Sequence, residues 1–151
     1  MNSFYFHNKV LHAESVSVSD LMEAYGSPLY IYSKNQIEFN WYQLEKAFGS
    51  HPHLICYAVK ANSNLAVLNV LANLGSGFDV VSIGELERVI AVGGKPSLCV
   101  FSGVAKTKGA IQKALEYGIY CFNVESASEL NLIESVANDI GIKAPISIRV
   151  N

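Results

Sequence analysis

The sequence predicts an α/β protein that forms part of a (β/α)8 TIM barrel. Apolar segments of strand length alternate with segments of helical pattern along most of the chain, and polar side chains follow the end of each apolar segment. Strands that alternate with helices pair in parallel. Barrel enzymes carry their sites at the carboxyl ends of such strands, so this distribution of polar residues favours a barrel.

Five apolar segments are predicted to be strands. They lack the alternation of polar and apolar residues that marks a half-exposed sheet, which predicts that both faces of the sheet are covered. The predicted strands are residues 54–59, 77–81, 98–101, 120–124 and 145–150. The helices predicted between them are residues 64–74, 84–92, 108–117 and 127–139. Glycines at the helix ends can stop each of these helices.

A further strand and helix are predicted before these units. Residues 29–32 are predicted to form a short strand, and Ser33 can cap a helix that runs to Phe48 and stops at Gly49. Apolar residues recur at helical spacing on this helix, so one of its faces is predicted to pack in a core. These residues are Ile37, Trp41, Leu44 and Phe48.

Residues 1–28 are predicted to hold an N-terminal strand and a short helix, which starts at Ser19 and ends near Gly26. The strand is indicated by Phe4, Phe6, Val10 and Leu11. A complete barrel takes about 250 residues, whereas this chain has 151. Residues 29–151 are therefore expected to be the N-terminal part of a barrel, about five of its eight βα units, within a longer protein.

The alternative architecture is an open, doubly wound sheet. A glycine-rich loop of the form G-x-G-x-x-G after the first strand would favour that fold. The glycines at Gly75 and Gly77 lead into a predicted strand rather than out of one, so they do not form such a loop.

The composition excludes several classes of protein. Half of the residues are hydrophobic, and the net charge of −2 is spread along the chain, so neither a disordered chain nor a basic nucleic-acid surface is indicated. No apolar segment is long enough to span a membrane, and the first residues lack the basic start and apolar block of a signal peptide. We therefore expect a cytoplasmic protein that binds neither nucleic acid nor a membrane.

The cysteines and histidines do not indicate a metal site. Cys56, Cys99 and Cys121 each lie in a predicted strand, and their odd number and spacing suggest neither a disulfide framework nor zinc. We interpret them as small buried hydrophobic residues. His51 and His53 flank a proline in a predicted turn, which we interpret as exposed to solvent.

Lys60 is the first candidate for chemistry. It follows the apolar strand at residues 54–59 and precedes a polar turn. A lysine at the end of a buried strand is desolvated, which lowers the pKa of its amine and makes it a nucleophile for carbonyl groups. The alternative is a lysine that marks the point where the strand reaches water.

Other polar residues follow the later strands. They are Asp79 with Ser82, Ser102 with Lys106, Asn123 with Glu125, and Arg149 with Asn151. In a barrel these residues share one end with Lys60. Polar residues also end buried strands in proteins where they have no catalytic role.

Five collinear segments resemble motifs of the ornithine/diaminopimelate/arginine decarboxylase family. They are residues 57–62 (YAVKAN), 77–86 (GFDVVSIGEL), 101–107 (FSGVAKT), 122–126 (FNVES) and 147–151 (SIRVN). The last three are most similar to the diaminopimelate branch. The resemblance implies a fold-type III barrel of the alanine-racemase type, whose later part and C-terminal β domain lie downstream of this chain.

The resemblance also implies the cofactor and the reaction. Lys60 would be the catalytic lysine that binds pyridoxal 5'-phosphate covalently, and the complete enzyme would decarboxylate meso-2,6-diaminopimelate to L-lysine. Family residues that would complete the site lie downstream or across a dimer interface, so the chain alone is expected to be inactive and the complete protein a homodimer.

Asp79 and Arg149 would bind the cofactor in this family. For Asp79 the alternative is a carboxylate at the start of the next helix, and for Arg149 it is a structural ion pair. Glu85 can add its negative charge to that of Asp79 at the site, or it can be an ordinary glutamate in the first turn of its helix. Ser102, Lys106 and Glu125 are weaker candidates for the site.

Three other functions stay open on the sequence. An arginine or ornithine decarboxylase of the same family would carry the same motifs. A non-catalytic protein that binds pyridoxal phosphate could retain every residue named above. An unrelated barrel, in which Lys60 is structural, would bind no such cofactor.

Overall fold

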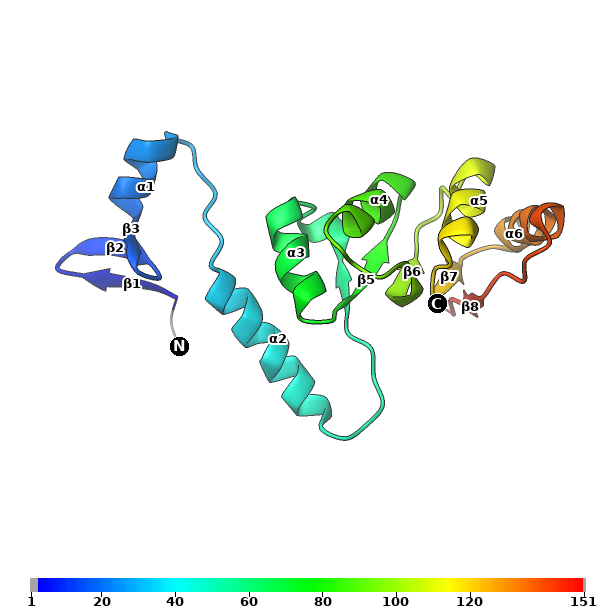
Figure 1. The fold of residues 1–151 in the computed structure, drawn as a ribbon, viewed down its shortest axis with the longest axis horizontal. Helices are drawn as coiled ribbons and strands as arrows, with labels where there is room; N and C mark the ends of the chain where they lie inside the picture. Colours follow the sequence, from blue (N-terminus) through cyan, green and yellow to red (C-terminus); the bar gives the residue numbers. More distant parts are fainter. Residues whose placement is uncertain (1–2, 151) are drawn as a thin grey trace. The chain divides into compact units, whose positions relative to one another are not determined.

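The computed structural model describes residues 3–150 and divides into two compact units, which meet in the chain between His51 and Pro52 (Figure 1). The first unit contains an antiparallel sheet of three short strands and two helices. The second contains a parallel sheet and the four helices that connect its strands.

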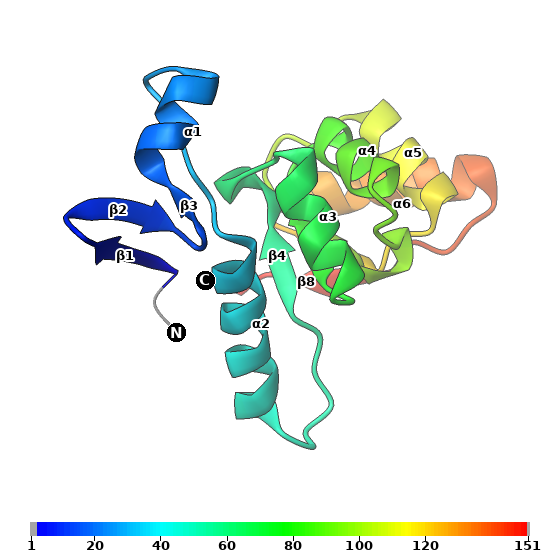
Figure 2. The same ribbon diagram turned by 60° about the vertical axis from the view of Figure 1, so that its left-hand side comes forward.

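The first unit begins with a β-hairpin (Figure 2). Strands β1 (Phe4–His7) and β2 (Val10–Ala13) pair in antiparallel register, and β3 (Val16–Ser17) pairs with β2. Asn8 and Lys9 reverse the chain with positive φ angles of 48° and 67°, the backbone geometry of a tight hairpin turn. The single strand predicted here is therefore wrong, because this turn places its apolar residues on two strands.

The two helices of this unit begin and end where capping residues predict. Helix α1 (Val18–Tyr25) begins after Ser17, whose hydroxyl accepts a hydrogen bond from the amide of Asp20, and it ends at Gly26. Helix α2 (Lys34–Phe48) follows the same rule between Ser33 and Gly49, so both predicted helices are confirmed.

Two other predictions for this unit are wrong. Residues 29–32 form no strand, because no strand of the described residues pairs with them. The apolar face of α2 is not packed in a core: Leu44 is 50% exposed and Phe48 is 43% exposed. Helical periodicity shows that a face is apolar, but it does not show that the chain supplies a surface to cover that face.

The second unit is a parallel sheet in the order β4-β5-β6-β7-β8. The strands are β4 (Cys56–Ala58), β5 (Gly77–Val80), β6 (Cys99–Phe101), β7 (Cys121–Val124) and β8 (Ile146–Ile148). All five predicted strands are present, and each is shorter than predicted. Consecutive strand order is the order of a barrel, whereas a doubly wound sheet reverses its order near the middle. The prediction of an incomplete α/β barrel is confirmed.

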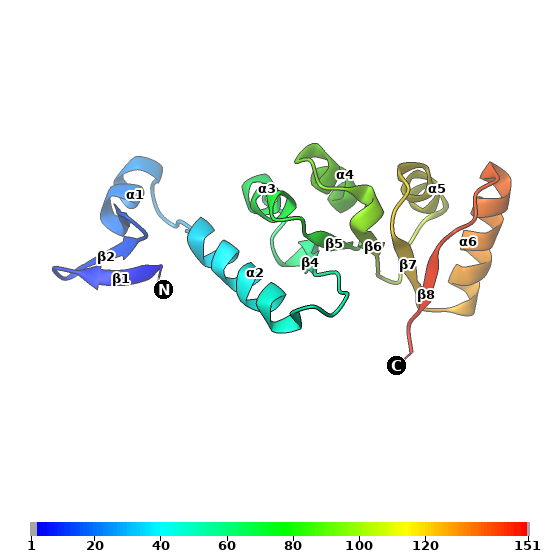
Figure 3. The same cartoon turned by 60° about the horizontal axis from the view of Figure 1, so that its bottom comes forward.

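Four helices cover one side of this curved sheet (Figure 3). They are α3 (Leu65–Asn73), α4 (Ile83–Ala91), α5 (Lys108–Tyr117) and α6 (Ala127–Ile140). Short 3-10 turns follow β4 (η1, Val59–Ala61) and precede β6 (η2, Pro96–Leu98). All four helices match the predicted positions within one residue at each end.

The core lies between the sheet and these helices. Its largest fully buried side chains include Phe78, Phe101, Phe122, Leu68, Leu86, Ile111 and Ile133. The rings of Phe101 and Phe122, on neighbouring strands, stack with their centroids 5.9 Å apart. This packing fixes the register of the strands and therefore the positions of the side chains that follow them.

The opposite face of the sheet is less covered than the sequence predicts. Alternate residues of the central strands, such as Asp79, Val100 and Asn123, are only half-buried, and Ile148 of β8 is 69% exposed. The strands are apolar on both faces, but the described residues place helices on one. Of the three free cysteines, Cys99 is buried as predicted, while Cys56 and Cys121 are half-buried.

Candidate functional site

The carboxyl ends of the parallel strands surround a cavity of about 420 Å³. Its lining residues are Lys60, Asp79, Val81, Ser102, Gly103, Asn123, Glu125, Ser147 and Arg149. Lys60, Asp79 and Arg149, the three site residues predicted from the sequence, thus share one cavity. Its volume lies in the usual range of small-molecule pockets, about 300–1,000 Å³.

Lys60 reaches the cavity from the turn η1, directly after β4. In the pairing of β4 with β5, Ala58 lies opposite Asp79, so Lys60 follows that pair by two residues. The sequence predicts a desolvated lysine, but in the structure Lys60 is exposed. Its amine is therefore accessible to a ligand in the cavity, and also to water.

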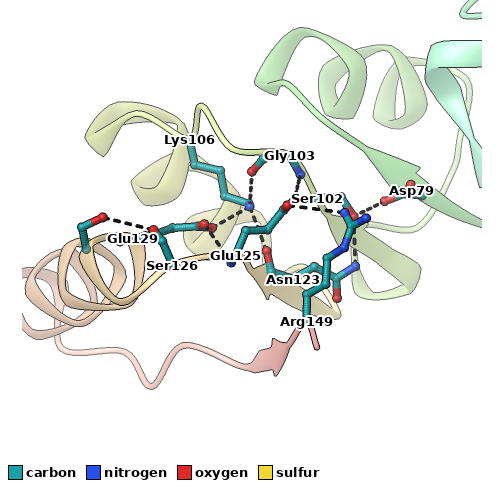
Figure 4. A network of polar contacts seen from close by, with 10 residues as sticks. Asp79, Ser102, Gly103, Lys106, Asn123, Glu125, Ser126, Glu129 and Arg149 are labelled. Carbon is teal, nitrogen blue, oxygen red and sulfur yellow. Dashed lines mark hydrogen bonds and ion pairs between the residues drawn. The ribbon is translucent and has the colours of Figure 1, made fainter. Parts of the chain in front are cut away.

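A chain of hydrogen bonds holds the carboxylate of Asp79 at the cavity (Figure 4). The hydroxyl of Ser102 donates to Oδ1 of Asp79, and Nδ2 of Asn123 donates to Oγ of Ser102 over 2.9 Å. Because the amide of Asn123 is a donor, the proton of Ser102 is free to point at the carboxylate. Three neighbouring strands or strand ends thus cooperate to orient one carboxylate.

Asp79 does not serve the start of α4. Ser82 caps that helix through the amide of Glu85, and the carboxylate of Glu85 accepts a hydrogen bond of 2.7 Å from the amide of Val81. This reciprocal arrangement resembles a capping box. Ser82 and Glu85 therefore act at the helix terminus, and neither lines the cavity.

Arg149 follows β8, which is the edge strand at the other side of the sheet from β4 and Lys60. Its Nη1 is 3.4 Å from Oε2 of Glu125, whose Oε1 accepts a hydrogen bond of 3.0 Å from the amide of Gly103. The structure shows the ion pair of the alternative interpretation and places Arg149 in the cavity lining, while its role toward a cofactor stays a prediction. The arginine side chain is 57% exposed, so the pair itself contributes less than about 1 kcal/mol.

Lys106 does not line the cavity but lies behind it. Its side chain is completely buried, and Nζ donates to the carbonyl groups of Gly103 and Asn123 and to Oε1 of Glu129. Glu129 was not identified from the sequence. The pattern Ser126-x-x-Glu129 signals the start of α6, but it does not reveal that the carboxylate reaches back to a lysine on another segment.

Ser147 is another lining residue that the sequence did not single out. It lies in β8 and pairs in register with Asn123 of β7, which places both on the cavity side of the sheet. Side chains alternate between the two faces of a strand, so Ser147 could have been assigned to the cavity side once its pairing with Asn123 was known.

The described residues contain no group of three histidine, cysteine, aspartate or glutamate side chains that could hold a metal ion. The same part of the chain contains no helix that is long and apolar enough to cross a membrane.

Sequence comparison identifies relatives along nearly the whole chain. The family described as "Pyridoxal-dependent decarboxylase, pyridoxal binding domain" matches residues 15–151. A diaminopimelate decarboxylase from Vibrio cholerae is 59% identical over 141 residues, which cover 93% of this chain and 34% of that protein. A diaminopimelate decarboxylase from Haemophilus influenzae is 55% identical over 151 residues, which cover all of this chain and 36% of that protein.

Solved structures agree with this result. Diaminopimelate decarboxylase from Helicobacter pylori, complexed with L-lysine, has a TM-score of 0.85 and 47% identity over 88% of this chain and 34% of its own. The enzyme from M. jannaschii, also with L-lysine, has a TM-score of 0.92 and 34% identity over 98% of this chain and 36% of its own. A lysine/ornithine decarboxylase from Vibrio vulnificus is more distant, with a TM-score of 0.77 and 25% identity over 88% of this chain and 35% of its own.

This chain spans about a third of the length of these relatives. The predicted family resemblance and the predicted barrel type are confirmed, and the predicted cofactor is of the class that this domain family binds. The chain belongs to the family of pyridoxal-dependent decarboxylases, whose pyridoxal binding domain it matches over residues 15–151.

Proposed function

We propose that the protein carrying this chain is a pyridoxal-phosphate-dependent enzyme that decarboxylates meso-2,6-diaminopimelate to L-lysine and carbon dioxide. The observation that supports this most strongly is the shared cavity of Lys60, Asp79 and Arg149, in a chain 59% identical to a diaminopimelate decarboxylase. Two related structures contain L-lysine, which would be the product of this reaction.

The residues of the cavity suit pyridoxal phosphate. Lys60 offers an exposed primary amine, which is the group that binds the aldehyde of this cofactor covalently. Arg149 offers a cation for an anionic group, and Asp79 offers an anion for a positively charged nitrogen. When bound, the cofactor acts as an electron sink for the bond that breaks at the α-carbon of the substrate.

Asp79 would stabilise positive charge on the nitrogen atom nearest to it. The hydrogen bond from Ser102, supported by Asn123, keeps its carboxylate turned toward the cavity. A fixed carboxylate needs no reorientation when charge develops beside it, which is the general advantage of a preorganised site. Lys60 lies two residues after Ala58, which pairs with Asp79, and it lines the same cavity as Asp79.

Arg149 would hold an anionic group of the cofactor. Glu125 binds one end of its guanidinium group and leaves other donors free, since arginine carries five N–H donors in a fixed plane. The same glutamate is anchored by the amide of Gly103, so the arginine is oriented by a fixed partner.

We further propose that residues 29–151 belong to the N-terminal part of the cofactor-binding barrel and that the segment before them, with strands β1 to β3 and helix α1, lies outside the barrel. The match of the pyridoxal binding domain supports a barrel role for most of this range. The complete enzyme would act in the cytoplasm as a homodimer. Light scattering of the natural-length protein tests the oligomeric state.

The cofactor role of Lys60 is tested by reduction with borohydride after incubation of the natural-length protein with pyridoxal phosphate. Peptide mass mapping should find the reduced cofactor on Lys60. Lys108 is an exposed lysine outside the cavity and should stay unmodified at the same cofactor concentration. If Lys60 stays unmodified in the folded protein, it does not bind the cofactor and only marks the end of its strand.

The substrate is tested by carbon dioxide release from meso-2,6-diaminopimelate, L-arginine and L-ornithine. Release from diaminopimelate alone supports the proposal, and release from either other amino acid supports the alternative within the family. A protein that forms the Lys60 adduct but releases carbon dioxide from none of them would be a non-catalytic homologue.

A further inference from the structure

Four hydrogen bonds close a ring directly behind the cavity (Figure 4). Nζ of Lys106 donates to the carbonyl of Gly103 over 2.6 Å, and the amide of Gly103 donates to Oε1 of Glu125 over 3.0 Å. The amide of Glu125 then donates to Oε2 of Glu129 over 3.0 Å, and Oε1 of Glu129 accepts from Lys106 over 2.6 Å. Every member is held at two points.

The ring is anchored by a buried ion pair. The side chain of Lys106 is 0% exposed and that of Glu129 is 8% exposed. A third acceptor, the carbonyl of Asn123 at 2.9 Å, gives each proton of the ammonium group a partner. A buried charge that loses one partner is strongly destabilised, so Lys106 and Glu129 hold each other in a single arrangement.

Only one side of the ring reaches the cavity. Gly103 and Glu125 line it, whereas Lys106 and Glu129 do not. Gly103 has a φ angle of 91°, which residues with a side chain rarely adopt, and this conformation accompanies an amide directed at Glu125. The other carboxylate oxygen of Glu125 faces Arg149 at 3.4 Å. The buried pair is therefore linked to the arginine through two residues.

We propose that Lys106 and Glu129 are positioning residues for Arg149, on which they act through Gly103 and Glu125. The ring fixes the carboxylate of Glu125 at the cavity wall, and that carboxylate orients the guanidinium group. The consequence for cofactor affinity rests on the proposed function, whereas the consequence for Arg149 itself does not.

The test compares natural-length protein, freed of cofactor, with the double variant Lys106→Met/Glu129→Leu. Replacing both partners by apolar residues avoids an unpaired buried charge and is often tolerated. The measured quantity is the rate at which phenylglyoxal modifies Arg149, determined by peptide mass mapping. Arg88 on α4 hydrogen-bonds the carbonyl of Ser63, away from the ring, and serves as the internal reference.

We expect the double variant to raise the modification rate of Arg149 severalfold relative to Arg88, because Glu125 no longer holds the guanidinium group in place. The matched control is Lys108→Met/Asp139→Leu, which removes an exposed ion pair of 2.9 Å between α5 and α6. The control variant should leave the relative rate of Arg149 unchanged. A folded double variant with an unchanged rate would overturn the proposal.

The variant Glu129→Gln gives a second, milder measurement. Glutamine keeps the shape of the side chain but only one acceptor oxygen, so either Lys106 or the amide of Glu125 loses its partner. A smaller rise in the Arg149 rate is expected. If neither Glu129→Gln nor the double variant folds, the pair serves the fold alone, and the proposed positioning role is rejected.

Cofactor affinity is measured separately by absorbance titration with pyridoxal phosphate. We expect the double variant to bind about tenfold more weakly than the parent, the lower end of the effect of removing a group that orients a ligand-binding residue in metal sites. If the parent itself binds no cofactor, the proposed function fails, while the Arg149 rates still decide the positioning role.

Discussion

The hydroxyl group of Ser102 donates a hydrogen bond to Oδ1 of Asp79, which joins residues 23 positions apart in the chain. Parallel pairing of β5 with β6 brings them together, since Asp79 lies opposite Val100 and Ser102 follows by two residues. The contact exists only because the strands align in this register. This hydrogen bond makes the orientation of Asp79 depend on Ser102, whether or not Ser102 itself contacts a ligand.

Replacement of Ser102 by alanine should therefore weaken the binding of pyridoxal phosphate to the natural-length protein. A hydrogen bond to a charged group contributes about 1.5–3 kcal/mol, so a loss of at least about tenfold in affinity is expected, measured by absorbance titration. The control is Ser128→Ala, which removes an exposed hydroxyl from α6 and should leave the affinity unchanged. Equal affinity of both variants would show that Ser102 does not orient Asp79.

Gly77 is required by a close approach of strands. A Cβ atom at this position would lie 2.6 Å from the carbonyl oxygen of Leu98 and 2.8 Å from Sγ of Cys56. Gly77→Ala should lower the free energy of unfolding by about 1–3 kcal/mol, the usual cost of overpacking. Denaturant unfolding of the natural-length protein measures this change.

The matched control is Gly109→Ala in α5, where a Cβ atom would meet nothing within 4 Å. Alanine is the better helix former, so this variant should be at least as stable as the parent protein. A destabilisation of the same size in both variants would show that the contacts of Gly77 are not the cause.

The sequence predicts the repeating units well because their signals are local. Apolar segments, capping residues and terminal glycines locate the five strands of the parallel sheet and the helices between them. The order of polar residues at the strand ends also predicts that Lys60, Asp79 and Arg149 meet. Parallel strands bring their carboxyl ends to one edge, so a residue's place in its strand is sufficient for this inference.

Contacts between distant side chains could not be predicted in the same way. Lys106 and Glu129 look like ordinary residues before and within a helix, and only the register of three segments buries them together. The helix face with Leu44 and Phe48 illustrates the opposite case. Its pattern is clear, but burial depends on a covering surface, which a local pattern does not contain.

The single variant Lys106→Met should be much less stable than the double variant with Glu129→Leu. Removal of the lysine alone leaves the buried carboxylate of Glu129 without its cation, which costs about 3–5 kcal/mol. Differential scanning calorimetry of the natural-length protein should show a clear decrease in Tm, most of which is recovered in the double variant. Similar Tm values for both variants would mean that water reaches Glu129.

The three thiols should react slowly with iodoacetamide in the folded protein. Burial raises the pKa of Cys99 to about 12 and, less strongly, raises the pKa of Cys56 and Cys121. Alkylation requires the thiolate, so Cys99 is expected to be the slowest of the three at about pH 8. Peptide mass mapping gives the order, and fast alkylation of Cys99 in folded protein would contradict its burial.

Glu14 should make the start of α2 sensitive to acid. Its carboxylate accepts hydrogen bonds from the hydroxyl of Ser33 and from the amide of Asn35, and these bonds lower its pKa below the usual value of 4.5. A carboxyl group with a lowered pKa in the folded state stabilises that state above its unfolded pKa. This contribution is lost as the pH falls through the folded pKa. Because Glu14 is only half-buried and water screens its charge, we expect less than about 1 kcal/mol.

The measurement is hydrogen exchange at the amide of Asn35 in the natural-length protein, corrected for the intrinsic pH dependence. Protection should be highest near neutral pH and should fall below about pH 4.5, where an unperturbed glutamate begins to bind its proton. Glu14→Gln keeps an acceptor oxygen but cannot titrate, so its protection should be lower at neutral pH and nearly independent of pH. The same acid-induced loss in both proteins would assign the effect to another group.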